Sequence, residues 1–206
     1  MRAILPALLL LAALTGCSDK PGADSGQMML TPDTKTFKNS DVTGLGYAGA
    51  FALNDQDGKP RTLADFKGKA VVIFFGYTHC PDVCPTTMAE MAAVMKELGP
   101  DADRVQVLFV TLDPERDTPA LLKQYVPAFD PRFIGLSGDA EATAKVAKEF
   151  RVFYQKVPGK DAGSYTMDHT AASYVFDPQG RVRLFVRHGQ GPEPIVQDLK
   201  VLLAGK

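Results

Sequence analysis

Two cysteines separated by three residues are the first feature of this sequence that could support chemistry. Cys80 and Cys84 follow a run of apolar residues, and Pro85 comes directly after the second cysteine. A thiolate is both a nucleophile and a metal ligand, and the positive end of a helix dipole stabilises it. The pair therefore predicts either a metal site or a redox-active dithiol at the start of a helix.

The residues on either side of the cysteines predict a strand followed by a helix. Residues 70–75 form a continuous apolar run between two glycines, as expected for a strand buried on both faces. After the cysteines, methionines and a leucine recur every three or four residues up to Gly99, which indicates an amphipathic helix. Pro85 suits the first position of that helix, so we expect Cys80 and Cys84 to lie in a tight loop and cap at its N-terminus.

The remaining apolar patterns alternate between strands and helices. Thr118 and Pro119 follow a predicted strand at 105–112 and are typical of a helix N-cap and first helical position. A polar stretch at 155–167 indicates an inserted hairpin or loop. The other predicted elements are a leading hairpin from residue 49, a short strand at 133–136, a helix at 139–150 with Ala140, Ala144, Ala147 and Phe150 facing inward, a terminal hairpin at 172–186 and a helix at 194–203.

This order of elements predicts an α/β fold. Alternating strands and helices imply parallel strands, and the terminal hairpin adds an antiparallel edge, so we expect a central mixed sheet flanked by helices. A dithiol where the first central strand meets a helix is typical of the thioredoxin-like fold. In that fold, the loop before the strand at 172–176 lies beside the dithiol. His169 stands in that loop, where a cis-proline usually occurs.

Two thiolates and one imidazole at one point would form a soft, three-coordinate site. Thiolate selects Cu(I) and imidazole also accepts Cu(II), so Cys80, Cys84 and His169 could hold copper in either oxidation state. A structural zinc site would need a fourth ligand from His79, an aspartate or water. Two alternatives stay open. The cysteines could form a redox disulfide, although three intervening residues rather than two weaken that reading, and the histidine could be a core residue.

Several charged residues are candidates for supporting roles around this site. Asp82 lies between the cysteines, where a carboxylate could orient a ligand or repel anionic thiols, and Asp168 precedes the histidine. Asp113, Arg116 and Asp117 follow a predicted parallel strand at its carboxyl end, the edge where α/β sheets place their sites. These three residues could surround the thiols and contact a partner, or they could form only a salt-bridged helix start.

Composition and the first residues predict an exported, membrane-attached domain. The chain has 23 basic and 24 acidic residues and a net charge of −1, which gives no reason to expect nucleic-acid binding. The apolar stretch at 3–14 has signal-peptide length and is too short to span a membrane. The residues before Cys17 resemble the bacterial lipobox, whose cysteine is lipidated. We therefore expect a lipoprotein signal peptide at 1–16, the lipidated cysteine with a flexible tether at 17–36, and a thioredoxin-like copper-binding domain at 37–206.

Three motifs in order resemble the signatures of the Sco/SenC family. They lie at 75–85, 113–119 and 168–170, and weaker similarity extends the match from about residue 37 to residue 203. The resemblance therefore covers nearly the whole predicted domain. It implies a membrane-tethered, thioredoxin-like copper protein that faces the periplasm and helps to assemble the copper A centre of cytochrome c oxidase.

The resemblance also implies how such a protein would act. Cys80, Cys84 and His169 would be the copper ligands, receiving Cu(I) or Cu(II) from another periplasmic copper donor and passing it to the copper A subunit of cytochrome c oxidase. A lipid anchor would hold the domain at a membrane of the cell envelope. The alternative is an enzyme, a periplasmic thiol–disulfide reductase in which the two cysteines keep the oxidase's copper-ligand cysteines reduced.

Overall fold

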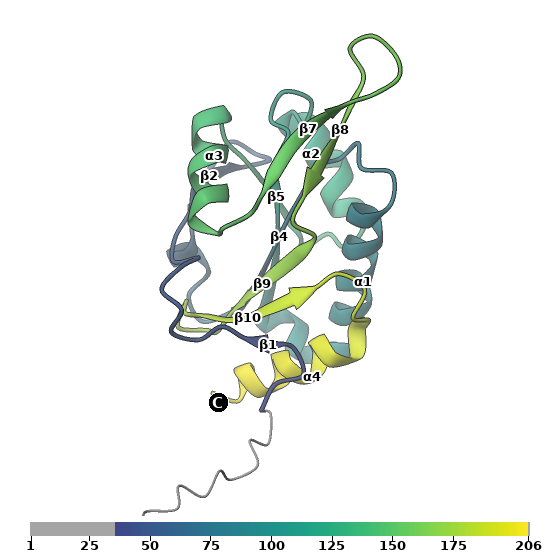
Figure 1. Cartoon of the computed structure of the whole chain (residues 1–206). Helices are drawn as coiled ribbons and strands as arrows, with labels where there is room; N and C mark the ends of the chain where they lie inside the picture. The colour runs from purple at the N-terminus through teal and green to yellow at the C-terminus, as the bar shows by residue number, and fades with distance from the viewer. Residues whose placement is uncertain (1–35, 206) are drawn as a thin grey trace, which may run out of the picture. The chain divides into compact units, whose positions relative to one another are not determined.

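The apolar run before the cysteines forms strand β4 (Ala70–Gly76), and every residue in it is buried. It pairs in parallel with β5 (Val105–Thr111) on one side and antiparallel with β9 (Ala172–Phe176) on the other. Burial on both faces explains why apolar residues occupy consecutive positions. The computed structural model describes residues 36–205, and β4 runs through the middle of its main sheet (Figure 1).

The main sheet of the described residues has eight strands in the order β1-β10-β9-β4-β5-β6-β2-β3. β4, β5 and β6 (Ile134–Ser137) are parallel, and the other pairs are antiparallel. The other four strands are β1 (Ser40–Asp41), β2 (Ala52–Asp55), β3 (Pro60–Thr62) and β10 (Val182–Arg187). The predicted central mixed sheet, with its leading and terminal hairpins, is confirmed.

Helices cover both faces of this sheet. α1 (Val83–Leu98), α2 (Pro119–Tyr125) and α4 (Pro192–Leu203) pack on the face that contains Phe74, and α3 (Ala140–Glu149) packs on the face that contains Phe75. Successive side chains of a strand point to opposite faces, so β4 contributes to both cores. Short 3₁₀ helices are formed by Leu63–Phe66, Gly99–Arg104 and Val126–Ala128.

A separate two-stranded sheet precedes β9 in the chain. β7 (Tyr154–Pro158) and β8 (Tyr165–His169) pair antiparallel, with Tyr154 opposite His169, so the predicted insertion is a hairpin. In Figure 1 its turn projects from the top of the domain. The hairpin shares no backbone ladder with the main sheet, so side-chain contacts must hold it in position.

The predicted start of the cysteine helix was wrong. α1 begins at Val83, so Pro85 is its third residue and Cys84 lies in the first helical turn rather than in a loop. The first N–H groups of a helix have no intrahelical acceptor, and a proline in this turn therefore removes no helical hydrogen bond. The earlier start brings Cys84 into the packed interior, where it is fully buried.

The predicted inward face of α3 was wrong in part. Ala140 and Ala144 are exposed, whereas Thr143, Val146 and Ala147 are buried. Alanine is small enough to be tolerated on either face, so the larger Val146 defines the packed side. The other helix predicted from a cap is confirmed: the Thr118 hydroxyl accepts a hydrogen bond from the Leu121 N–H at 3.2 Å.

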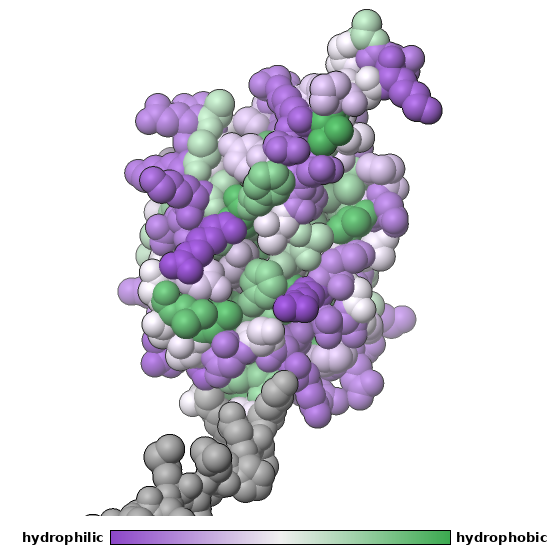
Figure 2. Space-filling view, in the orientation of Figure 1, coloured by the Kyte–Doolittle hydropathy of each residue, from purple (hydrophilic) through white to green (hydrophobic). Residues whose placement is uncertain are grey.

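The remaining observations concern the surface of the domain, the length of its helices and the predicted leader. Hydrophilic side chains cover most of the face in Figure 2, with apolar side chains scattered among them, as is normal for a globular domain. Within residues 36–205, no helix combines the length and apolar character needed to cross a bilayer. The predicted signal peptide, the lipidated Cys17 and nearly all of the tether lie outside the described residues, so they stay predictions.

Candidate metal centre

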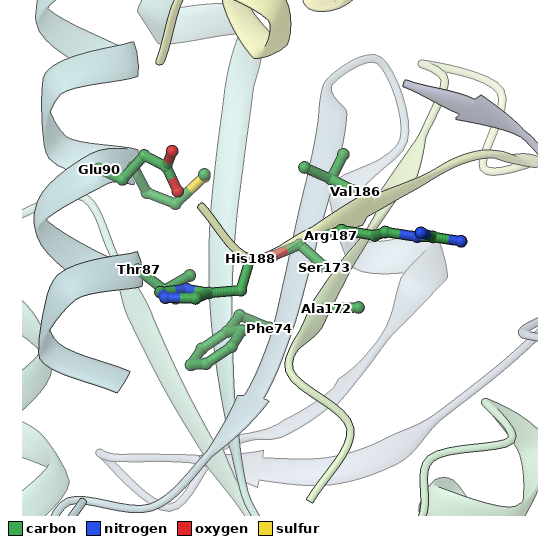
Figure 3. A pocket seen from close by; sticks show the side chains of 9 residues that line it. Phe74, Thr87, Glu90, Ala172, Ser173, Val186, Arg187 and His188 are labelled. Atoms are coloured by element: carbon green, nitrogen blue, oxygen red, sulfur yellow. The ribbon is translucent and has the colours of Figure 1, made fainter. Parts of the chain in front are cut away.

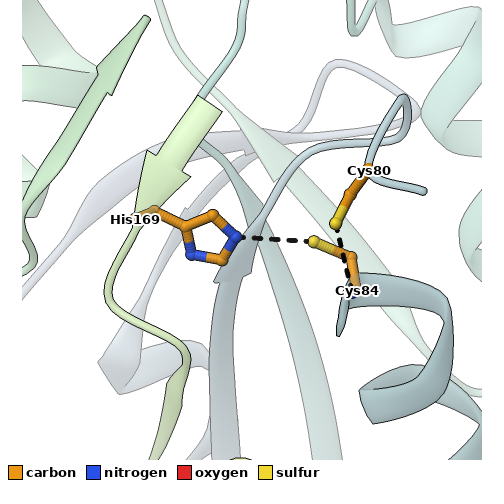
Figure 4. Close-up of side chains that lie close together, drawn as sticks. All are labelled: Cys80, Cys84 and His169. Carbon is orange, nitrogen blue, oxygen red and sulfur yellow. Dashed lines mark hydrogen bonds between the residues drawn. The ribbon is translucent and has the colours of Figure 1, made fainter. Parts of the chain in front are cut away.

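Cys80, Cys84 and His169 lie together at the end of β4, with their ligand atoms within 4.8 Å of one another (Figure 4). Cys84 Sγ is 3.6 Å from His169 Nε2, and Cys80 Sγ accepts the Cys84 backbone N–H at 3.4 Å. The histidine is 85 residues from Cys84 in the chain. The fold therefore brings together the three side chains that the sequence analysis singled out.

A short turn between β4 and α1 places the two sulfurs. The Cys80 N–H donates to the Tyr77 carbonyl at 3.3 Å, which turns the chain back towards the helix. A Cβ atom at Gly76 would lie 2.9 Å from Cys84 Sγ, so the last residue of β4 must lack a side chain for the sulfur to occupy its position. Both thiols are free, with Cys80 partly exposed and Cys84 buried.

His169 is the last residue of β8, and its ring points at Cys84 (Figure 4). Its Nδ1 lies 3.1 Å from the Thr170 carbonyl oxygen. An Nδ1–H donated to that carbonyl leaves a lone pair on Nε2, directed at the sulfurs. Burial lowers the pKa of His169 below its ordinary value of 6.5, against the opposing effects of Thr170 and Asp168. The imidazole is thus held in the neutral form that binds metals.

The Cys84 thiol departs from the sequence expectation. Burial raises its pKa well above the ordinary value, and the nearby Cys80 and Asp117 raise it further. Desolvation of a charged sulfur therefore outweighs the helix dipole that was expected to favour thiolate. A metal ion that binds Cys84 must displace its proton.

The donor set fits a soft metal ion with few ligands. Two sulfurs and one imidazole nitrogen converge, and no other histidine, cysteine or carboxylate of residues 36–205 joins the group. His79 does not: its Nδ1 lies 3.1 Å from the Thr78 hydroxyl and 3.7 Å from the Asp117 carboxylate. Structural zinc sites are closed by four ligands, whereas Cu(I) prefers thiolates and accepts three. The arrangement therefore favours copper over zinc.

The two aspartates next to the ligands have little contact with them. Asp82 is the exposed N-cap residue of α1, and its carboxylate accepts a hydrogen bond from the Thr86 hydroxyl at 3.3 Å. Asp168 is also exposed and acts on His169 only through its charge. Neither is among the groups that converge on the sulfurs.

Asp113 and Arg116 connect the loop after β5 to the hairpin. Arg116 forms an ion pair with Asp113, donates to the Tyr165 carbonyl oxygen at 2.9 Å and stacks 3.6 Å from the centre of the Tyr165 ring. The Tyr165 hydroxyl donates to Asp113 at 2.8 Å. The ion pair of Asp113 and Arg116 thus lies in the loop that leads into α2. It also holds Tyr165, the first residue of β8, the strand that ends at His169.

Asp117 connects the same loop to the turn that carries Cys80. Its buried carboxylate accepts hydrogen bonds from the Thr78 N–H at 3.0 Å and from the Thr78 and Thr111 hydroxyls, each at 2.6 Å. Asp117 was predicted from the sequence to lie near the site, whereas neither threonine was. Part of the evidence for them was in the sequence, because Thr78 lies within the cysteine motif and Thr111 lies in the predicted strand at 105–112.

Two tyrosines of the site were also missed. The Tyr77 ring packs edge-on against His169, with centroids 6.0 Å apart, and burial raises the pKa of its hydroxyl, which also interacts with Cys80. Tyr165 contacts Arg116 as described above. Tyr77 could have been found, because it lies within the cysteine motif at 75–85. Tyr165 could not, because its place depends on how the hairpin docks.

This chain is similar to a protein-family model, to curated proteins and to solved structures. The SCO1/SenC family model matches residues 42–204. The SCO2 homolog of mouse mitochondria is 38% identical over 154 residues, which are 74% of this chain and 60% of the mouse protein. The structure of Bradyrhizobium japonicum ScoI with copper bound is 51% identical, has a TM-score of 0.68, and the match covers 74% of this chain and 96% of that one. The fold of BsSco, a member of the Sco family of cytochrome c oxidase assembly proteins, is also similar, with 23% identity, a TM-score of 0.62, and coverage of 81% of this chain and 98% of that one. This chain belongs to the SCO1/SenC family.

Proposed function

We propose that this chain is a metallochaperone that binds copper through Cys80, Cys84 and His169 and delivers it to the copper A centre of cytochrome c oxidase. The observation that carries the proposal is the convergence of two thiols and one imidazole within 4.8 Å. Two relatives support it: ScoI was solved with copper bound, and BsSco belongs to a family of oxidase assembly proteins.

Three ligands of unequal exposure suit stepwise release. Cys80 and His169 are partly exposed and Cys84 is buried, so a partner's ligand can approach from the side of the first two and displace them before Cys84. A three-coordinate site has room for that incoming ligand, whereas a closed tetrahedral site has none. The raised pKa of Cys84 favours its reprotonation, which makes release from the last ligand easier.

The test is a copper titration of the reduced full chain in detergent, with a chromophoric chelator as competitor. We expect one copper ion per chain, a loss of affinity of about tenfold or more in His169→Ala, and near-complete loss in Cys80→Ser or Cys84→Ser. The control is His188→Ala. His188 lies after β10, and its Nδ1 is 2.9 Å from the Thr87 hydroxyl (Figure 3). Copper bound by His169→Ala as tightly as by wild type would contradict the ligand set.

The proposal includes a location. A lipid on Cys17 would hold the domain at a membrane of the cell envelope, facing the periplasm, where another copper donor would load it. The leader and the lipobox-like residues support this location. Labelled palmitate should enter the wild-type protein and not Cys17→Ser, and label in both would refute the anchor.

The second candidate is a thiol–disulfide reductase that acts on the oxidase's copper-ligand cysteines. The two free thiols at a helix start support it, with the partly exposed Cys80 as the attacking sulfur and the buried Cys84 as the resolving one. Turnover on an oxidised target peptide that survives His169→Ala and is lost in Cys80→Ser would favour this candidate.

A further inference from the structure

Asp117 is a buried carboxylate that the proposed copper ligands do not contact. It is 1% exposed, and its three hydrogen-bond donors, the Thr78 N–H and the hydroxyls of Thr78 and Thr111, carry no formal charge. Among residues 36–205 its one ion-pair partner is His79, whose Nδ1 is 3.7 Å away and whose side chain is 50% exposed. No arginine or lysine of this part of the chain forms an ion pair with Asp117, so its hydrogen bonds are what chiefly offset the cost of burying the carboxylate.

The hydrogen bonds of Asp117 fix the turn that carries Cys80. Thr78 stands two residues before Cys80, and Thr111 is the last residue of β5, so the carboxylate ties this turn to the neighbouring strand. Cys80 Sγ then lies where it accepts the N–H of Cys84. Neither sulfur takes part in the bonds to Asp117. The turn is therefore held in place independently of any metal, which is how a preorganised binding site is built.

The charge of Asp117 also reaches the site. Its carboxylate accepts hydrogen bonds from Thr78, two residues before Cys80, and from Thr111, which pairs in register with Gly76. Gly76 in turn lies against Cys84 Sγ, so the carboxylate is next to the segments that carry both sulfurs. Inside a protein, a fixed negative charge stabilises a cation more strongly than it does in water. Cu(II) carries one more positive charge than Cu(I), and Asp117 therefore stabilises Cu(II) more.

We propose, on the basis of the copper function above, that Asp117 is a positioning residue which also sets the preference of the site between Cu(II) and Cu(I). It holds the Cys80 turn against β5, and it supplies a nearby negative charge that favours the higher oxidation state over the lower one.

The test is Asp117→Asn, which keeps the size of the side chain and removes its charge. Cu(I) and Cu(II) affinities of the full chain in detergent are measured by chelator competition, and the midpoint potential by redox titration. We expect Cu(II) affinity to fall about tenfold more than Cu(I) affinity, which equals a rise of about 59 mV for a one-electron couple. Asp177→Asn is the matched control, because Asp177 is also 1% exposed but lies in the turn between β9 and β10. It should leave the potential unchanged.

A second variant should shift the midpoint potential of the copper site in the opposite direction. Thr111→Val removes one donor from Asp117 and leaves the carboxylate, whose less compensated charge should lower the midpoint potential. An unchanged affinity ratio in folded Asp117→Asn would overturn the inference. Where Asp117→Asn does not fold, an unchanged or raised potential in Thr111→Val would overturn it. A wild-type chain that binds no copper would refute the proposed function itself, so the two failures can be told apart.

Discussion

At the scale of one residue, Gly76 decides whether a buried sulfur can occupy the site. A Cβ atom there would lie 2.9 Å from Cys84 Sγ, 2.9 Å from Phe74 Cε1 and 3.1 Å from Phe109 Cε2. All three side chains are fully buried, so none can move without disturbing the core. We predict that Gly76→Ala lowers the free energy of unfolding by about 1–3 kcal/mol and weakens copper binding, as measured by urea denaturation and chelator competition.

Gly135→Ala is the control for this prediction. A Cβ at Gly135 in β6 would lie 3.1 Å from Val126 Cγ2 and 3.2 Å from Leu122 Cβ, so it also overpacks the core but touches no sulfur. Gly135→Ala should lose stability and keep its copper affinity. Equal loss of copper affinity in the two variants would show that general destabilisation, rather than displacement of Cys84, explains the effect.

At the scale of elements, Arg116 links the hairpin to the loop after β5. Arg116 binds the Tyr165 carbonyl and ring, and β8 shares no backbone ladder with the main sheet. We predict that Arg116→Gln speeds amide hydrogen exchange in β8 and lowers copper affinity, by less than His169→Ala does, because the imidazole stays available but is less well placed. Hydrogen-exchange mass spectrometry and chelator competition measure the two effects.

Lys156→Gln is the matched control on the same hairpin. Lys156 forms an ion pair with Glu115, and both side chains are exposed, at 45% and 64%. Exposed pairs contribute little to stability, so this variant should exchange and bind copper like the wild type. If Arg116→Gln behaves in the same way, then the hairpin is positioned by other contacts.

The difference between local and distant contacts explains what could be predicted from the sequence. The cysteine pair was predictable because strand, turn and helix follow one another in the chain and leave local patterns. His169 was predictable only through the expected fold. The contact of Arg116 with Tyr165 was not predictable, because side-chain packing decides how a hairpin docks. The start of α1 was misjudged since proline is tolerated throughout the first helical turn.

At the scale of the whole molecule, the alternation of strands and helices predicted parallel strands at the centre of the sheet. It did not determine which strands the two hairpins pair with. The leading hairpin joins the sheet through β2 next to β6, and the terminal hairpin joins through β9 next to β4. Asp198 of α4 ties down the start of the described chain, accepting hydrogen bonds from the N–H groups of Lys38 and Asn39 at 2.7 and 2.8 Å. Such long-range contacts leave no periodic signal.

The stability of the whole molecule should depend on pH in two ranges. Burial lowers the pKa of His169 below 6.5, so the unfolded chain binds a proton that the folded chain does not, and stability falls as the pH drops below about 6.5. The hydrogen bond from Arg132, despite partial burial, lowers the pKa of Asp130 below 3.8, so its contribution is lost only at more acidic pH. Urea denaturation of the metal-free protein at several pH values should show both ranges, and His169→Gln should remove only the first. A variant that loses stability between pH 6.5 and 5 as steeply as wild type would contradict this assignment.

The placement of His169 on a hairpin outside the main sheet has one more consequence. A copper ion bound to all three ligands would cross-link that hairpin to α1 and the β4 turn, adding to the packing of Met167 and Tyr77 that already joins them. Loading would tighten the molecule and unloading would loosen it. A partner that senses this stiffness could distinguish a full carrier from an empty one without touching the ion.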